Sequence, residues 1–259
     1  LETDFNCANY FDAAQSADWD LVLDMTDFDN GDLSVETLFV NGLGRITSQA
    51  FGEDRDTVDA LVDFTSMGVS ARDANLAAAL GRSINGSIAF IWRDGQPFLL
   101  PGFLVEGRDY ALQGRARLEG GVVEGDLRAE YNDIARLSGL AGRDLSGALS
   151  ARLGGTWGPE RNRFDITARL DGRDLGLDQP QADALLSGES KITLDMGGAD
   201  GQITLRAFRA QAQSLTADAS GRISTSGLDL SGRLDFADLS ALGAQYGGRL
   251  LADIGVTGP

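Results

Sequence analysis

Apolar and polar residues alternate along most of the chain with a period of two. In the segment 164–170, Phe, Ile, Ala and Leu hold the even positions, and charged or hydroxyl residues hold the odd ones. The segments 127–132, 192–197 and 214–219 alternate in a similar way. Successive side chains of a β-strand point to opposite faces of its sheet, so the pattern predicts strands with one apolar and one polar face. Such strands are typical of antiparallel sheet.

Short turn signals separate these segments. They are Asn30-Gly31, Asp94-Gly95, Asp200-Gly201 and Ser226-Gly227. Asn-Gly and Asp-Gly favour the tight turns that join antiparallel strands. The first pair therefore predicts a hairpin between strands at 21–25 and 33–40.

A few segments carry apolar residues at helical spacing instead: 74–80, 132–142, 237–248 and a stretch near Ala182. Each predicts one or two helical turns at a strand edge, where an open sheet needs cover. We expect Asn132 or Asp133, and Asp238, to cap two of these helices, and Gly142 and Gly247 to end them.

The chain also repeats itself on a longer scale. The segment Asp94–Leu137 aligns with Asp200–Leu242, pairing Phe103 with Phe208. Repeats that continue end to end favour an elongated stack in which each unit buries its apolar surface on the next. We expect one continuous repeat region, in approximate units 1–75 (partial), 76–180 and 181–259 (partial). Two duplicated globular domains are the alternative.

Composition narrows the function classes. The 259 residues carry a net charge of −17, which disfavours nucleic acid as a partner. They include no histidine and a single cysteine, Cys7, which removes the commonest general base and the main zinc ligands. We therefore expect no enzyme activity, no cofactor, no metal site and no internal disulfide. The acidic segment 24–32 is interpreted as a solvated hairpin tip and not as a calcium loop.

Neither a leader nor a membrane span is evident in the sequence. The longest apolar stretch, Ile88–Leu104, is interrupted by Arg93, Asp94 and Pro97, among others. Because the chain ends within a turn motif, we expect it to be a fragment of a longer protein.

These patterns predict a mainly β fold. We expect an elongated, repetitive, predominantly antiparallel sheet that curls into an open groove, with a few short helices at strand edges. The residues expected to line the groove are Leu127, Tyr131, Phe164, Ile166, Leu170, Ile192, Leu194, Met196, Leu234 and Phe236. A face that closes into a sandwich core produces the same pattern, and that alternative stays open.

Two sequence segments resemble those of a known family. They are LRAEYNDIARLSGLAGRDLSGALSARLGG at 127–155 and LDLSGRLDFADLSALGAQYGGRLLADIGVTGP at 228–259. Both resemble the recurrent units of the TamB family, within the AsmA-like bridge-type lipid transfer proteins. The resemblance covers most of 74–259, and the first 70 residues match less clearly.

The resemblance implies a function. TamB-like proteins are anchored in the inner membrane of Gram-negative bacteria and cross the periplasm as a β-groove. The groove is linked to transport of phospholipids towards the outer membrane, by shielding their acyl chains, and to assembly and secretion of outer-membrane proteins. Its outer-membrane partner, TamA, would be contacted through parts outside this chain. The alternative is a structural or adhesive β-rod with a closed apolar core.

Overall fold

The computed structural model describes residues 2–6, 16–48, 56–159, 162–225, 227–243 and 245–258. Cys7 and Ser226, which figure in the expectations above, lie outside these residues. The chain divides into two compact units, residues 1–120 and 121–259, and each is described by itself.

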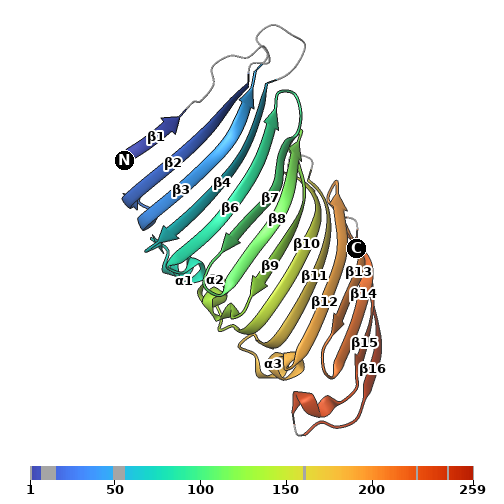
Figure 1. Cartoon of the computed structure of the whole chain (residues 1–259). Coiled ribbons are helices and arrows are strands. Elements are labelled where there is room, and N and C mark those ends of the chain that lie inside the picture. The colour runs from blue at the N-terminus through green and yellow to red at the C-terminus, as the bar shows by residue number, and fades with distance from the viewer. Residues whose placement is uncertain are drawn as a thin grey trace. The chain divides into compact units, whose positions relative to one another are not determined.

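Unit 1 is an antiparallel ladder in which each long strand pairs with the next along the chain (Figure 1). Its long strands are β1 (Glu2–Asn6), β2 (Ser16–Asp29), β3 (Leu33–Thr47), β4 (Thr57–Met67), β6 (Ser83–Arg93), β7 (Phe98–Glu106) and β8 (Tyr110–Glu119). The short strand β5 (Ser70–Ala71) pairs with β3. Helix α1 (Ala74–Leu80) follows β5 at the strand ends.

Unit 2 is also an antiparallel ladder in which each strand pairs with the next along the chain. Its strands are β9 (Val122–Tyr131), β10 (Ser146–Gly158), β11 (Arg163–Gly176), β12 (Glu189–Ala199), β13 (Gln202–Gln211), β14 (Leu215–Ser224), β15 (Gly227–Phe236) and β16 (Leu250–Gly258). Its short helices are η1 (Ile134–Leu137), α2 (Ser138–Ala141), α3 (Pro180–Leu186) and η3 (Leu239–Leu242). All of them connect consecutive strands at their ends.

The predicted turn chemistry is confirmed where the structure describes it. Asn30 Oδ1 accepts hydrogen bonds from the N–H groups of Asp32 and Leu33, at 3.0 and 2.8 Å, and closes the β2–β3 hairpin. Asp200 and Gly201 both have positive φ, 53° and 78°, which is the backbone of the favoured hairpin turn.

The predicted helices are all present, and three of the four expected caps are confirmed. Asp133 and Asp238 accept hydrogen bonds from the N–H groups of Ala135 in η1 and Ser240 in η3, each at 2.9 Å. Gly142 ends α2 in the left-handed conformation. The expectation for Gly247 is wrong, because η3 is a single turn that ends at Gly243.

The sequence repeat has a structural counterpart. The segment 94–137 forms β7, β8, β9 and η1, and the segment 200–242 forms β13, β14, β15 and η3. Pairing slips just before Phe103 in β7 and just before the aligned Phe208 in β13. The repeat therefore specifies a β-bulge as well as the strands on either side of it.

Within the described residues, neither ladder has a second layer. Among the described residues, extensive contacts between strands are made only by neighbours in the ladder, and the short helices contact strand ends and one another. No large side chain in the described part of the chain is fully buried. The prediction of a mainly β, antiparallel, open sheet with a few short helices is thus confirmed. None of the described helices combines the length and the apolar character needed to cross a membrane.

Candidate functional site

Strand pairing determines which side chains share a face, because directly opposed residues in a sheet point to the same side. In unit 2 one row runs from Leu127 through Leu153, Ala168 and Leu194 to Phe208. Following every register from β9 to β16 brings all the predicted lining residues to one side. They are Leu127, Tyr131, Phe164, Ile166, Leu170, Ile192, Leu194, Met196, Leu234 and Phe236.

We call this side the apolar face of unit 2. No charged residue occupies a paired position on it from β9 to β16, and Ser190 and Tyr131 are its polar members. Further large residues lie on it that the sequence reasoning did not select. They are Val123, Leu149, Leu153, Trp157, Ile203, Leu205, Phe208, Leu215, Ile223, Leu228, Leu230, Leu250, Ile254 and Val256.

A signal for these residues was present in the sequence. Leu153 and Trp157 stand two and six residues after Ala151 and continue the alternation that begins at Leu149. Gly154 and Gly155, which lie between them, interrupt the apolar–polar pattern and hide it.

The apolar face is only partly shielded from solvent. Phe236 and Ala168 are buried, and most of its other large side chains are half-buried. Leu153 and Trp157, on an interior strand, remain 40% and 56% exposed. A side chain of this size buried in a closed core would be almost inaccessible. The face is therefore an accessible apolar surface within the described part of unit 2.

A glycine opposite an aromatic ring determines how that ring lies on this surface. A Cβ added to Gly198 would lie 2.2 Å from the ring of Phe164, its cross-strand partner. The ring therefore lies flat over the neighbouring strand instead of projecting from the sheet. In unit 1, Trp19 lies over Gly44 in the same manner.

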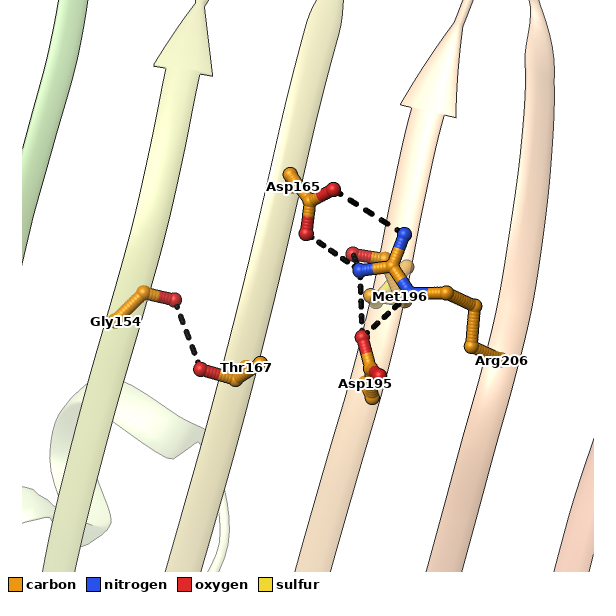
Figure 2. A network of polar contacts seen from close by, with 6 residues as sticks. All are labelled: Gly154, Asp165, Thr167, Asp195, Met196 and Arg206. Carbon is orange, nitrogen blue, oxygen red and sulfur yellow. Dashed lines mark hydrogen bonds and ion pairs between the residues drawn. The ribbon is translucent and has the colours of Figure 1, made fainter.

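The opposite side, the polar face of unit 2, is held by ion pairs across strands. Arg206, in the β13 bulge, donates to Asp195 on β12 at 2.7 Å and to Asp165 on β11 at 2.5 Å (Figure 2). Gly197 lies between them, and a Cβ there would be 2.7 Å from the guanidinium. These hydrogen bonds, first to Asp195 and then to Asp165, raise the pKa of Arg206. One side chain thus ties three strands together.

Other arginines on this face have single carboxylate partners. The pairs are Arg128–Glu130, Arg169–Asp171, Arg209–Asp218, Arg233–Asp253 and Arg249–Asp235. The hydrogen bond from Arg249 lowers the pKa of Asp235. Because these pairs are exposed, each contributes little to stability, and their main effect is to neutralise and solvate the face.

Groups that would suggest chemistry are sparse. At the acidic hairpin tip, Asp29 Oδ1 accepts from Gly31 N at 2.7 Å, so its carboxylate stabilises the turn. Within the described ranges, no three His, Cys, Asp or Glu side chains are grouped to hold a metal ion.

Comparison with known proteins adds no further identification. The chain matches no family model, and neither a curated protein nor a solved structure is similar to it at a significant level. The resemblance to TamB therefore stays a prediction from the repeat phrases.

Proposed function

We propose that the apolar face of unit 2 shields phospholipid acyl chains from water. One observation carries this proposal. On eight successive strands, the paired positions of this face carry apolar residues or glycine, apart from Tyr131 and Ser190. No second layer covers them among the described residues. A soluble fold rarely leaves so large an apolar surface exposed without a ligand or partner for it.

The chemistry of the face suits an acyl chain. Such a chain needs apolar contact along its length, and burial contributes about 0.8 kcal/mol per CH₂. The ten predicted lining residues of this face are aliphatic or aromatic, and none is charged. A charged side chain there would make no favourable contact with an acyl chain, and removing water from the charge would cost free energy.

The evenness of the face suits movement as well as binding. Leu, Ile, Ala and Val recur from strand to strand, and the ring of Phe164 lies over Gly198. Neighbouring positions therefore offer similar contacts, so an acyl chain meets no deep minimum at which it would be trapped. A lipid headgroup would remain in water at the open side.

Within a cell, this surface would form part of a phospholipid path across the periplasm of a Gram-negative bacterium. The resemblance to TamB supports that setting, with an inner-membrane anchor and a TamA partner outside this chain. It also supports a contribution to assembly of outer-membrane proteins.

Site-specific photo-crosslinking tests the proposal. Benzoylphenylalanine is placed at Ile166 or Trp157 on the apolar face, and at Thr167 on the polar face as the matched control. The purified chain is irradiated with phospholipid vesicles, and adducts are identified by mass spectrometry. We expect phospholipid adducts at Ile166 and Trp157 and none at Thr167.

Two other results would change the conclusion. If Ile166 and Trp157 formed no adduct and were protected from a water-soluble label, the face would be covered by protein. The chain would then be a structural rod with a closed core. Equal adducts at Ile166 and Thr167 would show adsorption of lipid without a binding face.

A further inference from the structure

A second apolar surface lies in unit 1, on the side of its ladder away from Trp19, Phe64 and Ile88. We call it the second apolar patch. It consists of Val22 on β2, Phe39 and Leu43 on β3, and Leu61 and Met67 on β4. These strands are consecutive in the ladder (Figure 1).

The patch is contiguous. Leu43 and Leu61 are directly opposed across β3 and β4, and Val22 is diagonal to both Leu43 and Phe39. Phe39 is in turn diagonal to Met67, two positions from its partner Thr65. Diagonal neighbours on one sheet face are within reach of large side chains.

Its members are well exposed, although they lie on interior strands. Met67, Leu43 and Phe39 are 57%, 52% and 47% exposed, and Val22 and Leu61 are each 38% exposed. The polar face of unit 2 has no large apolar side chain at the paired positions from Ser150 in β10 to Asp235 in β15. Alternation alone does not require such a patch.

The charges around the patch define its partner. Asp20, Asp24 and Asp63 point to the same side and are exposed, and within the described residues none of them has an ion-pair partner. Arg45, the one basic residue on this side of β2–β4, is bound to Asp18 at 2.6 Å. The patch is thus apolar with a net negative rim.

From this combination we infer that the second apolar patch binds a cationic amphipathic helix of a partner protein. Apolar side chains of the helix would cover Leu43, Leu61 and Phe39, and its Lys or Arg residues would pair with the free carboxylates. The rim repels anionic lipid surfaces and a second copy of the same face. Leu61 and Met67 are about 20 Å apart along β4, which a helix of about 13 residues spans.

The inference is independent of the lipid proposal, since it concerns another unit and other residues. A fluorescent peptide of about 14 residues, with Leu and Lys at helical spacing and one photoreactive leucine, serves as the probe. It is titrated against the whole chain, and its crosslinks are mapped by mass spectrometry. A peptide with Glu in place of Lys is the control ligand.

We expect the Lys peptide to bind, the Glu peptide not to bind, and crosslinks to fall in β2–β4. The double substitution Leu43→Asn with Leu61→Asn is expected to weaken binding at least about tenfold. Asp20→Asn with Asp63→Asn is expected to weaken it several-fold and to reduce its salt dependence. Urea denaturation followed by circular dichroism serves as the folding control and is expected to stay unchanged in each variant.

The opposite results are equally specific. Crosslinks confined to β9–β16, or binding unaffected by the Leu43/Leu61 pair, would overturn the inference. The inference would also be overturned if the chain formed a dimer, or bound phosphatidylglycerol vesicles, and the Leu43/Leu61 variant lost that dimer or that binding. In those cases a second copy or a membrane would be the occupant.

Discussion

Units 1 and 2 are built from the same alternating strands, but their second faces differ. In unit 2 the polar face carries carboxylates matched to arginines, as in the Arg206 cluster. In unit 1 the side away from Trp19 carries exposed apolar residues such as Phe39 and Leu43, beside carboxylates such as Asp20 that have no ion-pair partner among the described residues. The second side of unit 1 therefore adds an apolar patch to its charged residues, whereas the second side of unit 2 is dominated by ion pairs.

The difference shows that the two faces of an alternating strand can have separate functions. A face neutralised by ion pairs is compatible with water and needs no partner. A face that mixes exposed apolar side chains with unmatched acids is costly in water, and a complementary partner relieves that cost. The two units can thus share a fold and bind different ligands.

The largest expected effect concerns the backbone of unit 2. Gly155 has φ 148°, and a Cβ there would lie 1.9 Å from Asp165 O, so Gly155→Ala forces the β10 and β11 backbones apart. We expect a loss of about 3 kcal/mol or more in the free energy of unfolding. Gly102→Ala in β7 of unit 1 is the matched control, because a Cβ there meets nothing within 4 Å. Urea denaturation followed by circular dichroism measures both, and equal losses would contradict the structure.

A carboxylate introduced by substitution distinguishes the apolar face of unit 2 from the second apolar patch of unit 1. Leu194→Asp places a carboxylate on the apolar face of unit 2, between Ala168 and Phe208. We expect a cost of about 2–3 kcal/mol and loss of lipid crosslinking at Ile166. Phe39→Asp, at an exposed position of unit 1, is expected to cost less than about 1 kcal/mol. Equal losses in the free energy of unfolding for the two substitutions would contradict this comparison.

The local control for that experiment lies one residue away. Thr193 is opposite Arg169 and Arg209 on the polar face. Thr193→Asp therefore adds a carboxylate beside two guanidinium groups and is expected to leave both stability and lipid crosslinking unchanged. A loss comparable to that of Leu194→Asp would mean that the strand, and not the face, is sensitive.

A smaller effect is expected from the ion pairs of the polar face. Arg206→Gln removes the contacts to Asp165 and Asp195 and leaves two nearby carboxylates that repel. We expect a lower thermal midpoint, with a deficit that shrinks at high salt. Arg222→Gln is the control, since Arg222 is exposed on the same face and has no ion-pair partner among the described residues. Identical midpoints for the two variants would show that the cluster contributes nothing.

The smallest effect is a pH dependence shared by the units. Hydrogen bonds from Arg45 and Arg249 lower the pKa of Asp18 and Asp235 below the ordinary value of 3.8. A carboxyl group with a lowered pKa in the folded state stabilises the fold above its ordinary pKa, and this contribution is lost as the pH falls through the folded-state value. We expect the thermal midpoint to decrease when the pH is lowered below about 4. The fall should be shallower in Arg45→Gln and Arg249→Gln, and an unchanged slope in both would refute the assignment.

Much of the fold follows from local patterns. The parity of Leu127 or Ile166 identifies its face, because the side-chain period of a strand is two whatever its neighbours are. The hairpin at Asn30-Gly31 and the caps at Asp133 and Asp238 depend on residues close in sequence. Gly247 failed as a helix end because nothing local distinguished it from Gly243.

Other features depend on register and could not be predicted in this way. Arg206 reaches Asp165 only because a bulge in β13 and a glycine at 197 align them across β12. The second apolar patch likewise arises from pairing, since Leu43 and Leu61 are far apart in sequence and adjacent only across β3 and β4.

The sequence by itself determined that this protein is built from antiparallel strands, which residues share a face within each strand, and where the chain turns. These are properties of one strand or one turn, governed by backbone sterics and side-chain parity. Only the tertiary structure decided that the apolar face of unit 2 has no covering layer within the described residues, and that unit 1 has a second patch. An apolar strand face has the same pattern whether another sheet, a lipid or a partner covers it, because burial depends on what packs against the sheet.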